Sequence, residues 1–248
     1  MKFNEIPKFV VNLETRPDRL EDIKFELNYL GWDYEVFKAV NRNNYMGCTL
    51  SHLEIIKIAK ERGYKRVMVI EDDCDVMPYA KSLIQDLEKQ LENIEFGVMN
   101  LTPTLNRHLN ISEKYNMLLD LTNIPPKENE NYGETFATNM LIYDMSVYDE
   151  IPKISETAFG TVGDYYYPID GYLAKYIYPN FQSYCPTLPI APQKKSYSDV
   201  SHGMYNNFYT QTYNWNQYSP IKIHHTYLNE SENKKIKQQN KHLPYNVG

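Results

Sequence analysis

The stretch VMVIEDDCD, Val67–Asp75, joins an apolar run of the kind found in buried strands to four acidic residues in five positions. Like charges at this spacing repel one another, and burial stabilises none of them in the charged form. A cation, a cationic surface or solvation at a loop tip would each relieve that repulsion. The pattern therefore predicts a strand that ends either at a ligand site or at a solvated turn.

Helix and strand patterns alternate around this run. Apolar spacing and glycine stops predict strand, helix, strand, helix, strand and helix, in that order, at residues 8–13, 15–31, 33–40, 47–63, 65–70 and 78–93. This order is typical of an α/β fold with a mostly parallel central sheet. Ligands of such sheets bind beyond the carboxyl ends of the strands, where the charged sequences after the first and third strands both fall.

The second half of the chain is less regular. Residues 95–101 and 136–144 are predicted strands, and the polar residues 102–133 are expected to hold a loop or a short hairpin. Residues 168–177 are predicted to form a short helix with Asp170 in its first turn.

Composition favours one domain over residues 1–248, with a charged tail at about 229–248. The formal net charge of −6 and the pI of about 5.6 argue against a nucleic-acid-binding surface. No apolar run reaches the roughly 18 residues of a transmembrane segment, and the N-terminus lacks the apolar part of a signal peptide. The three cysteines, an odd number without a CxxC pair, are expected to be reduced thiols, which indicates a cytoplasmic protein.

The acidic residues suit a particular kind of cation. If the strand continues past Ile70, alternation places Glu71, Asp73 and Asp75 on one face and Asp72 on the other. Two carboxylates at this spacing can hold Mn²⁺ or Mg²⁺, with diphosphate oxygens completing the shell. A calcium loop is disfavoured, because the EF-hand spacing is absent. The alternative is a solvated acidic turn without a ligand.

Three segments together resemble the motifs of glycosyltransferase family 25: VNLETRPDR at Val11–Arg19, GCTLSH at Gly47–His52 and EDD at Glu71–Asp73. Weaker similarity in FATNMLIYD, PIDGYL and PIAPQKKSYSDV extends the resemblance over about residues 8–200. The family includes bacterial lipooligosaccharide galactosyltransferases and enzymes that add galactose to collagen hydroxylysine. The resemblance implies a GT-A fold, an αβα sandwich. It also implies a metal-dependent, inverting transfer of galactose or a related hexose from a UDP-sugar to a hydroxyl of a glycan or protein.

The resemblance also implies which residues hold the metal. Asp73 is the first choice as a direct ligand of Mn²⁺ or Mg²⁺, with Glu71 beside it, while Asp72 orients a neighbour. The role of Asp75 stays open. GT-A enzymes commonly add a ligand from the C-terminal region, and the candidates here are His225, which is taken first, His202, His224 and Asp199.

The nucleotide sugar is expected to contact the first motif. Asn12 and Leu13 end the first strand, where backbone groups of this fold meet the nucleobase. Arg16 and Arg19 stand one helical turn apart and suit a diphosphate. The alternative for the two arginines is a surface pair with a nearby acid, either Glu14 or Asp22.

The second motif and the C-terminal part of the chain supply the other expected contacts. Ser51 and His52 are predicted in the first turn of the second helix, whose N–H groups favour phosphate. The alternative is an N-cap serine and a core histidine. The remaining expected contacts to the nucleotide sugar are Glu71, Asp72 and Gln193, with Lys194 and Lys195 for the diphosphate.

An inverting transfer needs a carboxylate that takes the proton of the acceptor hydroxyl. Asp170 in PIDGYL is the predicted general base, and Asp164 is the second candidate. The alternative for Asp170 is an acid that stabilises the first turn of a helix. Two other functions stay open: a catalytically inactive member of the family that binds nucleotide sugar or glycan, and a metal-dependent phosphohydrolase.

Overall fold

The computed structural model describes residues 1–42, 45–102, 104–105, 112, 114–122, 135–156, 168–194, 196–198 and 203–205. Within them, a seven-stranded sheet has the order β2-β1-β3-β8-β4-β9-β6. Its strands are β1 (Lys8–Asn12), β2 (Glu35–Lys38), β3 (Arg66–Glu71), β4 (Val98–Asn100), β6 (Leu118–Asp120), β8 (Met140–Asp144) and β9 (Ser183–Pro186). The pairings make five strands run one way, with β8 and β6 opposite. The predicted α/β fold with a mostly parallel sheet is confirmed.

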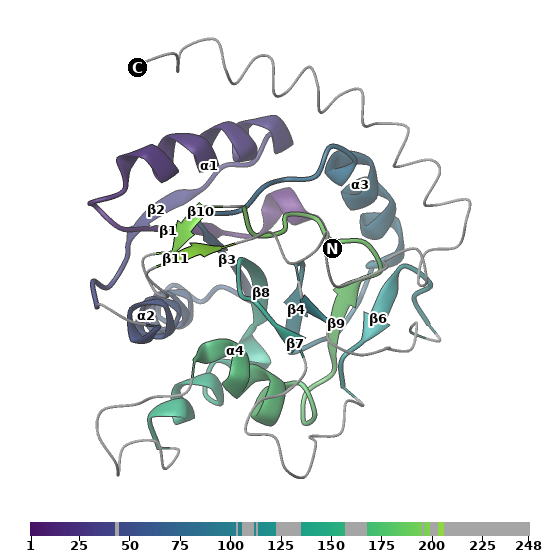
Figure 1. Ribbon diagram of the computed structural model, residues 1–248. Coiled ribbons are helices and arrows are strands. Elements are labelled where there is room, and N and C mark those ends of the chain that lie inside the picture. Colours follow the sequence, from purple (N-terminus) through teal and green to yellow (C-terminus); the bar gives the residue numbers. More distant parts are fainter. Residues whose placement is uncertain are drawn as a thin grey trace.

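Helices cover both faces of this sheet (Figure 1). α1 (Pro17–Leu30) and α3 (Ala80–Gln90) lie on one side, and α2 (Met46–Glu61) and α4 (Ile169–Tyr172) lie on the other, which confirms the predicted sandwich. No helix in the described part of the chain has both the length and the apolar character needed to cross a bilayer.

The shorter elements include three 3₁₀ turns, η1 (Phe3–Glu5), η2 (Met145–Val147) and η3 (Ile151–Glu156), and the π-turn η5 (Leu173–Ile177) after α4. Two small antiparallel ribbons pair β5 (Thr104–Leu105) with β7 (Thr135–Phe136) and β10 (Ser196–Ser198) with β11 (Gly203–Tyr205).

The first helix begins and ends where its sequence predicts. Pro17 is the first residue of α1, where its missing N–H costs nothing, and Ile23 and Leu27 are fully buried one turn apart. Gly31 follows the helix with φ of 74°, and its amide donates to the carbonyl of Asn28. Glycine adopts this left-handed conformation without the steric cost of a side chain, so the chain turns there toward β2.

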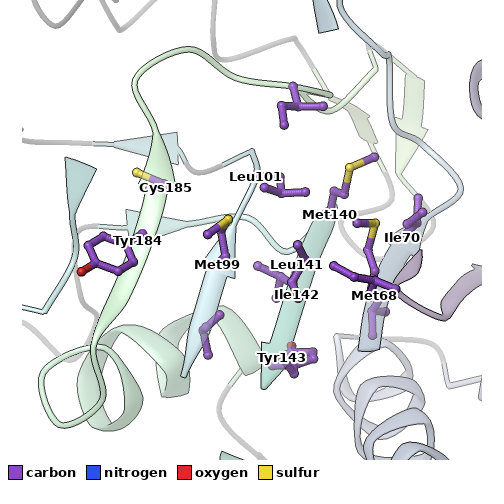
Figure 2. Close-up of a cluster of buried hydrophobic side chains, with 14 of the residues drawn as sticks. Met68, Ile70, Met99, Leu101, Met140, Leu141, Ile142, Tyr143, Tyr184 and Cys185 are labelled. Carbon is purple, nitrogen blue, oxygen red and sulfur yellow. The ribbon is translucent and has the colours of Figure 1, made fainter. Parts of the chain in front are cut away.

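The core is centred on β3 and β8. All residues of Val67–Ile70 and of Met140–Tyr143 have 0% exposed surface. Figure 2 shows Met68 and Ile70 of β3 beside Met140 of the neighbouring strand β8. Burial on both faces explains why β3 is a continuous apolar run rather than an alternating one. The acids that follow β3 therefore begin at the edge of the core.

The predicted strand at residues 136–144 is divided in two. β7 ends at Phe136, β8 begins at Met140, and Ala137 between them has φ of 74°. A non-glycine residue in this left-handed conformation costs about 1–2 kcal/mol, so the surrounding contacts must hold it there. The interruption lets the side chain of Thr138 reach Glu71 and that of Asn139 reach Asp73, at the end of β3.

Gly47 packs closely at the start of α2. A Cβ atom there would lie 2.6 Å from the carbonyl oxygen of Val40 and 3.3 Å from the amide nitrogen of Arg42. Alanine normally stabilises a helix relative to glycine by about 1 kcal/mol. For Gly47→Ala we expect the opposite, a loss of about 1–3 kcal/mol in the free energy of unfolding measured with urea, because backbone atoms must move.

A control in the same helix separates this contact from helix propensity. Lys57 is exposed on α2, and Lys57→Ala should change the free energy of unfolding by less than about 0.5 kcal/mol. A Gly47→Ala variant that is more stable than the wild type would contradict the close packing at the start of α2.

Candidate active site

The acids follow β3 at a point where a distant chain segment meets the sheet. β3 ends at Glu71, and residues 72–73 form a turn. Cys74 then pairs with Gln193 in an isolated antiparallel bridge. The extended conformation stops at Glu71, so strand alternation does not decide how the later acids point.

Asp72 holds two side chains of the N-terminal motif. Asn12, the last residue of β1, donates through Nδ2 to Asp72 Oδ2 at 2.7 Å, and Arg19 donates through Nη1 to Asp72 Oδ1 at 3.0 Å. Burial raises the pKa of Asp72 above its ordinary value, although Arg19 and Asn12 favour the charged form. These contacts fix β1 and the first turn of α1 beside the acids.

Asp73 lies between two side-chain amides. Asn139 donates through Nδ2 to Oδ1 at 2.7 Å, and Gln193 donates through Nε2 to Oδ2 at 2.9 Å. Arg19 Nη1 is 3.7 Å from Oδ2. Burial, and then the nearby Glu71 carboxylate, raise the pKa of Asp73 to about 7. Asp73 is thus a buried acid whose charge lacks full compensation.

Glu71 points to the opposite side, toward α2. Its Oε1 accepts a hydrogen bond from Thr138 Oγ1 at 2.5 Å and from Cys48 Sγ at 3.5 Å, and His52 Nε2 is 3.7 Å away. Burial raises the pKa of Glu71, but His52, Thr138 and Cys48 outweigh that effect and lower it overall. In the part of the chain that the structure describes, Oε2 has no hydrogen-bond donor. The side chain is 22% exposed.

Asp170 reaches the same region from the first turn of α4, as predicted. Its Oδ1 accepts the amide of Gly171 at 2.7 Å. Burial raises the pKa of Asp170, and the Glu71 carboxylate adds to this rise, against hydrogen bonds from the amides of Gly171 and Ala137. Two acids from distant segments therefore affect each other's charge, which makes this region a candidate acid–base site.

The two arginines of the first motif have different environments. Arg16 precedes α1 with φ of −121° and pairs with Asp18 through Nε–Oδ1 and Nη2–Oδ2 contacts of 3.0 and 2.8 Å. The predicted spacing of one helical turn is wrong, because the helix begins at Pro17. Of the two acids expected from the sequence as partners, Glu14 contacts Lys38 and Asp22 contacts Lys194.

Ser51 and His52 lie deeper in α2 than the sequence predicts. The helix begins at Met46, so both residues are in its second turn, and both are completely buried. Ser51 Oγ donates to the carbonyl of Gly47 at 2.7 Å and accepts the amide of Val40 at 2.9 Å. The first-turn placement is therefore wrong, and Ser51 is occupied by backbone partners.

Other predicted residues are placed as follows. Leu13 is half-buried at the turn after β1, where its carbonyl accepts the amide of Arg16 at 2.8 Å. Asp75 is half-buried, and its amide donates to the carbonyl of Pro192 at 2.8 Å.

Sequence reasoning missed Cys48, Thr138 and Asn139, although all three lie in segments that carry the family resemblance. The predictions that fall outside the described residues are His225, His202, His224, Asp199, Asp164 and Lys195.

Asp73 leads to a pH prediction. Its pKa rises on folding from the ordinary value of 3.8 to about 7, so the folded chain binds this proton more tightly than the unfolded chain. The contribution of Asp73 to the free energy of unfolding should therefore fall as the pH rises from about 4 to about 7. In the presence of EDTA, Asp73→Asn should lack this component.

Chemical unfolding across that pH range measures the effect. Asp149, which is 75% exposed, provides the control, because Asp149→Asn should keep the wild-type pH profile. Identical profiles for the wild type and Asp73→Asn would contradict the raised pKa.

Comparisons with known proteins give one family. The model of glycosyltransferase family 25 (LPS biosynthesis protein) matches residues 43–184, a range that includes Cys48, Glu71, Asp73 and Asp170. No curated protein shows significant similarity to the chain.

Two solved structures show low similarity. One is a glycosyltransferase involved in the glycosylation of the major capsid of PBCV-1, with 8% identity, coverage of 73% of this chain and 81% of that chain, and a TM-score of 0.45. The other is the inositol-1-phosphate CTP transferase from T. maritima, with 16% identity, coverage of 74% of this chain and 67% of that chain, and a TM-score of 0.38.

Proposed function

Because the chain belongs to glycosyltransferase family 25, we propose that it is a metal-dependent, inverting hexosyltransferase. It moves a hexose, with galactose as the first candidate, from a UDP-sugar to a hydroxyl of a glycan or protein. The observation that carries this proposal is the gathering of Glu71, Asp73 and Asp170 at the edge of the core, where burial raises the pKa of Asp73 and of Asp170. A GT-A type of donor site, as the resemblance implies, would lie over these acids.

Glu71 and Asp73 suit a hard cation by their chemistry. Carboxylate oxygens are the ligands that Mn²⁺ and Mg²⁺ prefer. Thr138 holds Oε1 of Glu71 and leaves Oε2 without a donor among the described residues. Arg19 contacts both Asp72 and Asp73, so that two carboxylates share one positive charge there. When bound, the metal would neutralise the negative charge that develops on the departing UDP.

Asp170 is proposed to take the proton from the acceptor hydroxyl. A carboxylate with a raised pKa is a stronger base than an exposed aspartate, which favours proton transfer near neutral pH. Hydrogen bonds from the amides of Gly171 and Ala137 hold the Asp170 carboxylate in place. This arrangement supports an inverting reaction, in which one base acts opposite the departing nucleotide.

The remaining predicted residues have two proposed roles. Arg16 and Leu13 stay candidates for direct contact with the nucleotide, at the outer edge of the site. Asn12, Asp72 and Gln193 would act mainly by holding the acids in place, because their side chains contact one another or Asp73.

A second candidate function is a catalytically inactive nucleotide-sugar or glycan-binding protein. The observation that favours it is that both carboxylate oxygens of Asp73 already accept amide hydrogen bonds, from Asn139 and Gln193. A ligand at Asp73 would then use the remaining lone pairs of these oxygens.

One assay separates the two functions. The chain is incubated with Mn²⁺, either UDP-galactose or UDP-glucose, and a panel of oligosaccharide and hydroxylysine-peptide acceptors. UDP release and the anomeric configuration of the product are followed by proton NMR. A transferase gives acceptor-dependent UDP release with a β-linked product. Donor binding without UDP release for any acceptor would favour the inactive protein.

A further inference from the structure

Cys48, His52 and Glu71 form a compact group at the junction of α2 and β3. Cys48 and His52 are four residues apart on α2, so their side chains share one helix face. Glu71 ends β3 and points toward that face. Cys48 Sγ, His52 Nε2 and a Glu71 carboxylate oxygen all lie within 4.8 Å of one another.

The separations match those between ligands of a tetrahedral ion. Zn²⁺ binds sulfur at about 2.3 Å and nitrogen or oxygen at about 2.0 Å, so tetrahedral ligands lie roughly 3.3–3.5 Å from each other. Cys48 Sγ is 3.5 Å from Glu71 Oε1, and His52 Nε2 is 3.7 Å from the same oxygen. Small side-chain movements would complete such a site.

His52 gives a second, independent observation. The residue is 0% exposed, and its Nε2 is a buried polar atom without a hydrogen-bond partner. Its other nitrogen, Nδ1, is 2.8 Å from the hydroxyl of Tyr143. When Nδ1 donates to Tyr143, Nε2 can bind a cation placed between His52 and Glu71, and the Tyr143 contact then fixes the ring as partners of metal-bound histidines do. A bound ligand would supply the partner that this buried nitrogen lacks.

We propose that Cys48, His52 and Glu71 bind one thiophilic divalent cation, with Zn²⁺ as the type. A thiolate, an imidazole and a carboxylate suit Zn²⁺, whereas Mn²⁺ and Mg²⁺ prefer oxygen ligands alone. Three protein ligands leave the fourth position open, and the partial exposure of Cys48 provides a route of entry. The thiol proton of Cys48 is released to solvent as the metal–sulfur bond forms. This site shares Glu71 with the proposed cation site of the transferase, but Zn²⁺ binding to Cys48, His52 and Glu71 requires no nucleotide.

The test uses the full chain, stripped with EDTA and free of nucleotide. Zn²⁺ is titrated in competition with a chromophoric chelator, and Co²⁺ serves as a spectroscopic substitute. We expect one ion per chain in this site and a thiolate-to-Co²⁺ charge-transfer band. Cys48→Ala should lower the Zn²⁺ affinity by about 100-fold or more and abolish the band, because loss of even an outer-shell partner costs about 10- to 100-fold.

Cys185→Ala is the matched control, because Cys185 is a buried thiol in β9 outside this group. It should keep both the affinity and the band. Equal Zn²⁺ affinity for the wild type and Cys48→Ala, or a Co²⁺ complex without a thiolate band, would overturn the proposal. If Cys48→Ala fails to fold, Glu71→Gln is used in its place. A lower Zn²⁺ affinity than that of the wild type would support the proposal, and an equal affinity would overturn it. Failure of this test leaves the response to UDP and Mn²⁺ untouched.

Discussion

Asp170→Asn is expected to slow sugar transfer by about 100- to 10,000-fold while the affinity for UDP stays unchanged. Asparagine can still accept the Gly171 amide at the start of α4, so the local structure should persist. It cannot take a proton from the acceptor. Initial rates of UDP release with an acceptor, together with UDP binding by calorimetry, measure the two quantities. Asp149→Asn, an exposed acid, should match the wild type in both.

The pH dependence of the transfer rate gives a second test of Asp170. The pKa of Asp170 is raised by burial, and the base must be deprotonated to act. The wild-type rate should therefore fall as the pH falls through that pKa, and Asp170→Asn should lack this dependence. A variant with the wild-type rate would remove Asp170 as the base. Loss of UDP binding together with the rate would make Asp170 a structural acid of α4.

Arg19→Met is expected to lower the free energy of unfolding by about 3 kcal/mol. Arg19 is 14% exposed and contacts Asp72 and Asp73, which are 10% and 7% exposed. Removing it leaves two neighbouring buried acids without their cation. For a chain of this size the change corresponds to a fall of about 6–12 °C in the melting temperature, which is measured by thermal unfolding.

Arg16→Met is the matched control, since Arg16 lies three residues earlier and pairs with Asp18, which is 64% exposed. An exposed pair of this kind contributes about 0–1 kcal/mol. If Arg19→Met is as mild as Arg16→Met but weakens UDP binding strongly, Arg19 is a diphosphate ligand, as the sequence suggests. Strong destabilisation with UDP binding retained would make it the cation that supports the acids.

The first half of the fold was predictable because each element carries its own local signal. β1 and β3 are apolar runs, and α1 has Pro17 at its start and Gly31 after its end. The second half depends on distant contacts. β6 and β9 have only three and four residues, and they pair Leu118 with Pro186 across a long separation. No local pattern indicates strands of this kind.

The candidate site was predictable in its acids but not in their surroundings. The apolar run before Glu71 already placed the acids at a strand end. Their partners depend on features that a sequence does not display: a left-handed Ala137 that brings in Asn139, and a bridge that brings in Gln193. Arg19 pairs with Asp72, which lies 53 residues away in the sequence, so the helical spacing around Arg19 did not predict this contact.

The central claim is that a hard cation and a nucleotide diphosphate bind over the acids that follow β3. Thermal unfolding with UDP, with and without Mn²⁺, tests it most directly. Ligand at about 100 times its dissociation constant adds about 2.7 kcal/mol, or roughly 5–10 °C for a chain of this size. We predict a shift that needs both UDP and Mn²⁺, persists in Asp149→Asn and disappears in Asp73→Asn. No shift with UDP and Mn²⁺ together, or an equal shift in Asp73→Asn, would contradict the claim.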